Sequence, residues 1–280
     1  METLRLFARN KLGLVGLVLV GLLVLSAVIG PGLRPVGDTA DLAHASEGPT
    51  AEHPLGTNFQ GLDNLALLFS GGKDIMLIAL ITGILETLIA VSIGATAAYF
   101  GGRADALLVA FIELWLTIPR FPLLAILATL LKLKEPWMLS IIIAVMGWPS
   151  LARQVRTVVL SLKKRDYIEA ANMLDLGPGH IIFREMLPNM LSFIAIALVS
   201  TIVFAIYYQT SLVFLGLIPF SSANWGVMLS LAENKGAIYT ASAAWGVITP
   251  IGAIVMLQIG LVWIMRALEE VFNPRLRQGV

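Results

Sequence analysis

The chain has 280 residues, of which 58% are hydrophobic and 13% are charged, and its mean hydropathy is +0.85. Soluble domains contain about 25% charged residues, so this composition excludes an ordinary soluble protein and predicts an all-α, polytopic membrane protein. The formal net charge of +1 offers no basic surface for nucleic acid. The chain has no cysteine and three histidines. This excludes disulfides and thiolate metal centres and leaves too few imidazoles for a histidine metal site.

Long apolar segments recur along the chain and set the expected number of membrane spans. A helix needs about 17–25 apolar residues to cross the hydrocarbon, and all but the fourth segment reach that length. The first segment lacks an obvious signal-peptidase site and is interpreted as a retained helix. The fourth is short, but its helix can begin near Glu135 and continue past Arg153. The six predicted spans are Leu12–Gly30, Ile75–Phe100, Leu107–Leu131, Trp137–Leu151, Met190–Leu217 and Ala244–Met265.

Lysine and arginine are distributed unequally between the segments that join these spans. Cytoplasmic segments of membrane proteins carry an excess of these residues. A cytoplasmic N-terminus places thirteen of them inside and five outside, so we expect an inner-membrane protein with both termini in the cytoplasm. The inside set is Arg5, Arg9, Lys11, Arg103, Arg153, Arg156, Lys163, Lys164, Arg165, Arg184, Arg266, Arg275 and Arg277, and the outside set is Arg34, Lys73, Lys132, Lys134 and Lys235.

The spans and their connections divide the chain into three regions. Residues 1–74 comprise the N-terminal tail, the first span and an external segment from Pro31 to Asp74, which is acidic and rich in turn-forming residues. Residues 75–270 form the transmembrane core, which includes an inner loop at about 153–189 and a second external segment from Ile218 to Ala243. Residues 271–280 form a cytoplasmic tail.

The inner loop begins with the stretch RQVRTVVLSLKKRDYIEAANML, in which apolar residues recur at helical spacing. One face of this helix therefore requires burial. The segment from Asp175 to Gly179 should end the helix, because glycine tolerates positive φ and proline cannot continue a helix. A second helix should then return to the membrane from IIFREMLPN. The predicted apolar stripe is Val155, Val158, Val159, Leu162, Ile168, Ala171 and Leu174.

This loop resembles the EAA loop of the binding-protein-dependent permeases of ATP-binding cassette (ABC) transporters. The resemblance rests on Glu169–Ala171, Ile181–Arg184 and Leu187–Asn189. It implies that the loop is a coupling helix that docks into a groove on a cytoplasmic ATPase. Asp175 stands where the family usually has glycine, and aspartate is among the few other residues that enter left-handed geometry. The implied coupling residues are Tyr167, Glu169, Ala170, Ala171, Asp175, Gly177, Arg184, Leu187 and Pro188.

Further motifs, in the same order along the chain, resemble the C-type subunit of the dipeptide, oligopeptide and nickel permeases. The sequence departs from that pattern at Asn58, Leu62, Glu185 and Gln209. The resemblance implies peptides as the favoured solute, and nickel or another small solute is the alternative. The matching stretches are Phe7–Leu12, His53–Asn58 with Gly61 and Asp63, Tyr99–Asp105, Ser211–Leu217, Trp225–Gly226 and Asn273–Arg275.

The resemblance implies the architecture of a type I ABC importer permease, with six transmembrane helices and one cytoplasmic coupling helix. The sequence contains no G-x-x-x-x-G-K-[ST] motif for nucleotide phosphates. We therefore expect a permease subunit that is not an enzyme and holds no cofactor, with ATP and Mg²⁺ bound by partner ATPases. The implied partners are a second homologous permease, two ATP-binding subunits or domains, an extracytoplasmic solute-binding protein and membrane lipid.

Ionisable residues within predicted spans are candidates for function, because a charge in the membrane is costly. Glu86 and Arg120 lie on antiparallel neighbouring helices at depths that differ by about 5 Å, counted from the turn at residues 101–102 with a rise of ~1.5 Å per residue. They can pair, and a structural ion pair is favoured over a direct substrate contact. Proline should kink the third span at residues 118–122 and form a pore wall there. The candidate intramembrane or pore residues are Glu86, Glu113, Pro119, Arg120 and Gln209.

Two other classes of function are open to a chain of this composition. An ion-coupled secondary transporter would use Glu86, Glu113 and Gln258 as ion ligands or proton relay. It would require internal pseudo-symmetry and a self-sufficient pore, and neither is evident in the sequence. A membrane enzyme would require a histidine–carboxylate or serine–histidine constellation, and the sequence suggests none.

Overall fold

The computed structural model describes residue 7, residues 10–131, residue 133 and residues 135–272. No strand occurs among these residues, and the predicted all-α fold is confirmed. Short helical segments are η1 (Leu42–His44), α7 (Asp166–Met173), α8 (Gly177–His180), the π-helix η2 (Ile181–Met186), α10 (Trp225–Asn234) and η3 (Ala237–Tyr239). The long helices are α2 (Lys11–Leu33), α3 (Asn64–Phe100), α4 (Gly102–Leu116), α5 (Arg120–Leu130), α6 (Pro136–Leu162), α9 (Leu187–Phe214) and α11 (Trp245–Phe272).

Several predicted features fall outside the described residues. They are the motif Asn273–Arg275, the tail from residue 273, residues 8 and 9 of the motif Phe7–Leu12, and the basic residues Arg5, Arg9, Lys132, Lys134, Arg275 and Arg277.

Among the described residues, five helices are long and apolar enough to cross a membrane, and a bent pair that passes the same test together gives a sixth candidate span. The pair consists of α4 and α5, whose axes differ by 77°. Pro119 precedes α5 with an extended backbone, so the helix stops where proline cannot continue it. The prediction of six spans is therefore confirmed, and the expected kink of the third span is a complete break. The fourth span is longer than its apolar segment, because α6 continues past Arg153 to Leu162.

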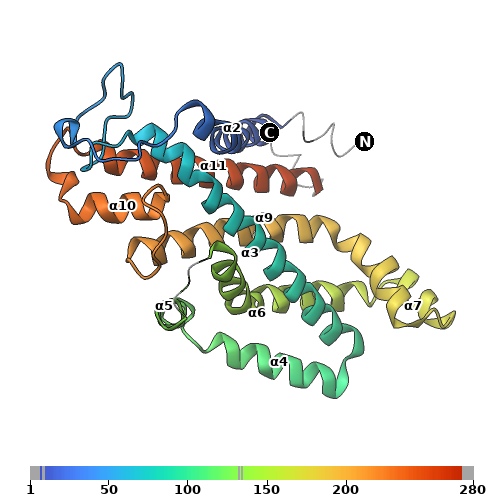
Figure 1. Ribbon diagram of the computed structural model, residues 1–280. Coiled ribbons are helices and arrows are strands. Elements are labelled where there is room, and N and C mark those ends of the chain that lie inside the picture. The colour runs from blue at the N-terminus through green and yellow to red at the C-terminus, as the bar shows by residue number, and fades with distance from the viewer. Residues whose placement is uncertain (1–6, 8–9, 132, 134, 273–280) are drawn as a thin grey trace.

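The 37-residue helix α3 runs through the middle of the bundle and touches most of the other helices (Figure 1). At ~1.5 Å per residue it is about 55 Å long, which exceeds the ~30 Å hydrocarbon thickness. It begins at Asn64, within the segment predicted to be external. Gly72, Gly83 and Gly94 recur on it every eleven residues. An added Cβ would press on α2 and α10 at the first position, on α9 at the second and on α6 at the third.

Contacts along α3 fix the direction of its neighbours. Gln209, near the end of α9, donates from Nε2 to the Ile75 carbonyl at 2.8 Å. Ser140, near the start of α6, donates from Oγ to the Ile78 carbonyl at 3.3 Å. Both contacts lie in the first part of α3, so α9 runs antiparallel to α3 and α6 runs parallel to it. Successive passes alternate in direction and give the bundle two ends, one marked by α7 and one by α10 (Figure 1).

The start of α2 and the end of α11 lie together, because Asn10 Nδ2 donates to the Glu270 carboxylate. The other end of α2 meets the start of α3, where Gly30 packs on Phe69. The first and last described helices therefore both have their outer ends towards the α7 end of the bundle.

The segment between α2 and α3 is folded around Asp63. Its Oδ1 accepts hydrogen bonds from the Leu65 and Ala66 amides, at 2.7 and 3.2 Å, and so caps α3. Its Oδ2 accepts a hydrogen bond from Arg34 Nε at 2.7 Å and lies 3.0 Å from His53 Nδ1. One carboxylate thus ties the end of α2, the external segment and the start of α3 together.

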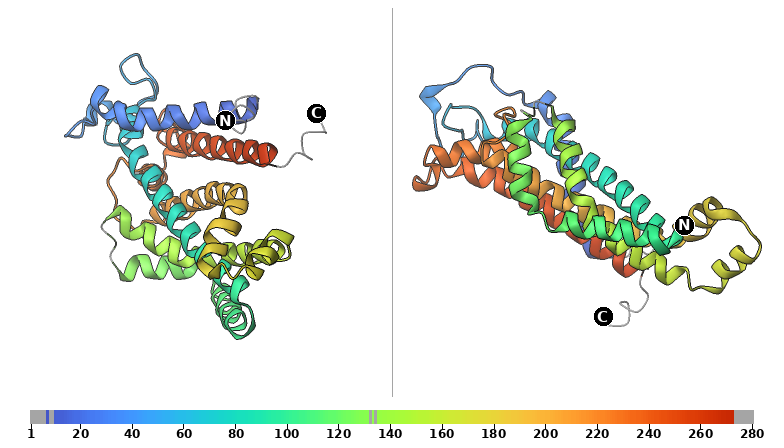
Figure 2. Two further views of the ribbon diagram at one scale, coloured as in Figure 1. Left: turned by 90° about the vertical axis from the view of Figure 1, so that its right-hand side faces the viewer. Right: turned by 90° about the horizontal axis from the view of Figure 1, so that it is seen from below.

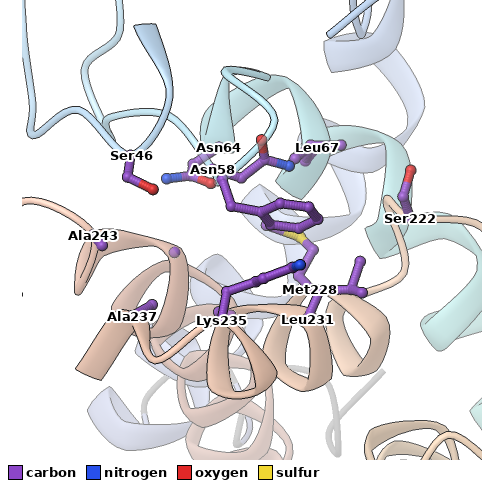
Figure 3. A pocket seen from close by; sticks show the side chains of 13 residues that line it. Ser46, Asn58, Asn64, Leu67, Ser222, Met228, Leu231, Lys235, Ala237 and Ala243 are labelled. Carbon is purple, nitrogen blue, oxygen red and sulfur yellow. The ribbon is translucent and has the colours of Figure 1, made fainter. Parts of the chain in front are cut away.

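This segment also packs on α10. Figure 3 shows Ser46, Asn58 and Asn64 facing Leu231 and Lys235 across a small pocket. The pocket has a volume of about 30 Å³, which is enough for one or two water molecules. The pocket is therefore a packing joint between the external segment and α10, and it is too small to hold a solute.

Replacing Asp63 should make the thermal stability of the protein change less as the pH falls into the acid range. Burial raises the pKa of Asp63, but hydrogen bonds from His53, the Ala66 amide and Arg34 outweigh it and hold the pKa below its ordinary value of 3.8. The ionised carboxylate therefore stabilises the fold above pH 3.8, and this contribution is lost as the pH falls through the lower folded-state pKa. We expect Asp63→Asn to lower Tm at neutral pH and the difference from wild type to narrow below about pH 4.

Thermal unfolding of the detergent-solubilised protein over that pH range measures this difference. Asp38→Asn, at an exposed position of the same segment, provides the control and should leave Tm nearly unchanged. A difference between Asp63→Asn and wild type that stays constant with pH would contradict the prediction.

Candidate functional site

A cavity of about 690 Å³ opens among the long helices. Residues of α3, α4, α5, α6, α9 and α11 contribute to its wall, together with the segment at the α4–α5 break. Its lining mixes apolar and aromatic side chains with polar and ionisable ones, which is typical of a site for a solute with both kinds of group. The polar lining residues are Glu86, Arg120, Ser150, Gln154, Ser200, Thr201, Tyr208 and Glu269.

Glu86 and Arg120 form the predicted ion pair on the wall of this cavity. Arg120 Nη2 lies 3.3 Å from Glu86 Oε2 and donates to the Ile143 carbonyl at 3.1 Å. The guanidinium also lies 4.2 Å from the centroid of the Tyr208 ring, a cation–π distance. Gly147 makes room for the pair, since a Cβ there would overlap both charged groups. Four helices thus meet at one pair of charges.

The break between α4 and α5 brings Arg120 to this position. Pro119 is the N-cap of α5 and Arg120 is its first residue. Ile118, Pro119 and Arg120 all line the cavity. The proline-containing stretch therefore forms part of the cavity wall, and its place in a translocation pore stays a prediction.

Two other predicted intramembrane residues lie away from the cavity. Glu113 is exposed on α4 and is not part of the cavity wall. Gln209 is 1% exposed and donates to Ile75 across the α3–α9 contact. The cavity wall therefore includes Glu86, Pro119 and Arg120 but neither of these two residues. Residue spacing along a single helix does not show which side chains face the cavity.

The loop between α6 and α9 projects from the α7 end of the bundle (Figures 1 and 2). The prediction that this loop begins with a single amphipathic helix is wrong in one respect. The chain turns between Leu162 and Asp166, and this turn divides the predicted helix into α6 and α7. Asp175 takes φ of 51° and Gly177 takes φ of 73°. The left-handed turn that the sequence required is therefore present with aspartate at the first of these positions.

The predicted coupling residues divide between the two faces of this loop. Ala171 packs inward beside Ile168, which secures α7 to the bundle. Tyr167, Glu169, Ala170, Asp175, Arg184 and Pro188 are exposed, while Gly177 and Leu187 are partly buried.

The projecting loop also exposes large apolar side chains that the sequence analysis did not assign to its outer surface. Met173, Leu174 and Phe183 are 79%, 71% and 69% exposed. Leu174 was predicted to continue the buried stripe, and that prediction is wrong. The turn after Leu162 changes the helical phase, and Leu174 caps α7 just before the left-handed turn. The sequence signal that could have indicated this exposed surface was the occurrence of large apolar residues on both sides of a charged turn.

Apolar helices that cross a membrane, a mixed cavity among them and a projecting loop with an exposed apolar tip define a membrane transport protein of the permease class. Residues 90–278 match the family model described as the binding-protein-dependent transport system inner membrane component. Residues 1–49 match the N-terminal transmembrane domain of oligopeptide transport permease C. The chain belongs to the family of binding-protein-dependent inner membrane components, which are permease subunits of ABC importers.

Individual relatives match over nearly the whole chain. The oligopeptide transport system permease protein OppC of Mycobacterium bovis is 31% identical, and the match covers 99% of this chain and 96% of that protein. OppC of Bacillus subtilis is 28% identical, with 97% and 88% covered. A protein of Brucella suis biovar 1, provisionally named a peptide permease, is 31% identical, with 96% and 89% covered.

Removing one member of the Glu86–Arg120 pair should harm folding more than neutralising both. Arg120→Ala leaves the Glu86 carboxylate, which is 4% exposed, without its cation, and breaking a buried pair in this way costs about 3–5 kcal/mol. Glu86→Gln combined with Arg120→Gln leaves two neutral amides in the same space and should cost less. The yield and Tm of monodisperse protein measure the difference, and equal losses would contradict a paired arrangement.

Proposed function

We propose that this chain forms half of the translocation pore of an ATP-driven importer and carries di- or oligopeptides across the cytoplasmic membrane. The observation that carries the proposal is the projecting loop, which presents Glu169, Met173 and Phe183 beyond the bundle. A loop with an exposed apolar tip needs a partner to cover it, since such side chains are costly in water. A cytoplasmic ATPase with a complementary groove meets that need.

The distribution of basic residues supports a cytoplasmic α7 end and therefore cytoplasmic termini. Lysine and arginine are enriched on the cytoplasmic side of membrane proteins. Among the described residues, the α10 end carries Arg34, Lys73 and Lys235, whereas the α7 end carries Lys11, Arg103, Arg153, Arg156, Lys163, Lys164, Arg165, Arg184 and Arg266.

The proposed complex contains a second homologous permease, two ATP-binding subunits or domains, and an extracytoplasmic solute-binding protein. The second permease would complete the pore of which this chain forms half. ATP and Mg²⁺ would bind to the ATPases. Closure of the two ATPases would move the docked loops and convert that movement into alternating access of the spans.

Peptides are the proposed cargo because their chemistry fits the cavity and agrees with the names of the relatives. A short peptide carries opposite charges at its ends, backbone amides and apolar side chains. The cavity offers Gln154, Ser200 and Tyr208 beside apolar and aromatic groups. In proteoliposomes that contain the full complex, uptake of labelled peptides supports this cargo, whereas uptake of nickel without peptide would assign the alternative solute.

Charge reversal at Glu169 should uncouple the permease from its ATPase. Glu169→Arg places a cation at an exposed position of α7, so the bundle should still fold. We expect ATPase co-purification and ATP-dependent uptake to fall at least about tenfold, equivalent to ~1.4 kcal/mol. Glu233→Arg, at an exposed position of α10, should retain the ATPase. Uptake by Glu169→Arg at the wild-type level, or uptake by the permease alone along an ion gradient, would reject the proposal.

The acidic external segment is the proposed contact for the solute-binding protein. Glu47 and Glu52 lie on it at the α10 end of the bundle, opposite the projecting loop. Exchanging both for lysine should weaken the stimulation of ATP hydrolysis by the binding protein and leave basal hydrolysis unchanged. Stimulation equal to wild type across a titration of binding protein would remove both residues from the contact.

A further inference from the structure

The turn between α3 and α4 carries the motif Tyr99–Asp105, to which the proposed function gives no role. Gly101 and Gly102 have φ angles of 65° and 56°, which glycine adopts without strain, so the chain reverses direction in two residues. Asp105 follows in the first turn of α4. Helix α4 lies at the edge of the bundle, close to the end from which α7 projects (Figures 1 and 2).

Asp105 forms a bidentate ion pair with Arg156 of α6. Arg156 Nε donates to Oδ1 and Nη2 donates to Oδ2, both at 2.6 Å. The two side chains are 19% and 27% exposed, with Asp105 the less exposed. Two parallel hydrogen bonds between planar groups fix orientation as well as distance. The pair therefore sets the position of the first turn of α4 against α6.

Lys163 makes a second contact with the same turn. It is the residue directly after α6, and its Nζ donates to the Tyr99 carbonyl at 2.7 Å. A cation at the end of a helix is favourable because the last carbonyls lack partners within the helix. Helix α7 begins at Asp166, only three residues later. The base of the projecting loop is thus bonded to both sides of the α3–α4 turn.

Beyond its first turn, α4 has little buried surface and also contacts α6. Ile112 is the one buried residue of α4. The ring centroids of Phe111 and Trp115 lie 5.9 and 6.4 Å from that of Trp148 on α6. Trp115 also lines the large cavity. Contacts with α6 therefore extend from the turn at the α7 end to the cavity wall.

We infer that the Asp105–Arg156 ion pair transmits movement of the projecting loop to the part of the cavity wall that the end of α4 and the α4–α5 break form. The inference rests on the proposed function, because an ATPase must drive the loop. A displacement of α7 moves the end of α6, and the pair makes the first turn of α4 follow. The far end of α4 then moves Trp115 and the break that precedes Arg120. Asp105 and Arg156 are positioning residues, since they act on the cargo through α4.

The test compares ATP hydrolysis with peptide uptake in proteoliposomes that contain the full complex. Arg156→Gln and Asp105→Asn should each preserve hydrolysis and lower the peptide taken up per ATP hydrolysed by about fivefold or more, the range of coupling between distinct sites. The double variant Asp105→Asn/Arg156→Gln leaves no unpaired charge, so it should assemble and show the same loss. The exchange Asp105→Arg/Arg156→Asp restores opposite charges and should recover part of the uptake.

Arg103→Gln is the matched control, because it removes an exposed arginine from the same turn and should keep the wild-type ratio. A wild-type ratio in the double variant, or a parallel loss of hydrolysis and uptake, would overturn the link, as would an exchange variant no better than the double variant. If the wild-type complex takes up peptide without ATP, the proposed function itself fails. If wild type is coupled and the double variant is equally coupled, only the link fails.

Discussion

Close approach of helix backbones along α3 is the constraint on which the rest of the structure depends. The apolar surface of a membrane helix gains little by leaving lipid for another helix, so van der Waals packing must hold the helices together. Gly72, Gly83 and Gly94 allow that packing against four different helices. Side chains at these positions would push α3 away from its neighbours, and the cavity among the helices would lose its shape.

The ion pair between Glu86 and Arg120 follows from the same packing. Two charges in an apolar bundle are tolerated only when they pair and find further partners. Gly147 brings α6 close enough for Arg120 also to donate to the Ile143 carbonyl. The break at Pro119 brings the guanidinium there, because an unbroken helix would carry residue 120 onward along the axis of α4. Pro119 and Gly147 therefore act together to place the two charged groups within contact distance of each other.

Much of this fold could be predicted from the sequence, because length, hydropathy and proline act locally. These properties indicated six spans, a kink near Pro119 and a turn from Asp175 to Gly179. The depth count along two antiparallel helices also predicted the Glu86–Arg120 pair. Exposure of Leu174 could not be predicted in this way, because a turn of three residues after Leu162 shifts the helical phase. Nor could the sequence separate Gln209 from the cavity, since that depends on which face of α9 meets α3. The coupling role of Glu169 stays a prediction that depends on a partner.

The uneven packing of the helices indicates where an importer of this construction can change shape. Packed interfaces switch between discrete arrangements and resist gradual sliding. The contact of Gly94 with Ala152 makes the α3–α6 interface such a unit. Helix α4 is different, because it has a single buried residue and is attached to α6 by two aromatic contacts and one ion pair. Its junction with α5 has no continuous helical hydrogen bonding to resist bending. Movement that begins at the projecting loop therefore meets least resistance at α4 and the break before Arg120, which is also where the chain lines the cavity.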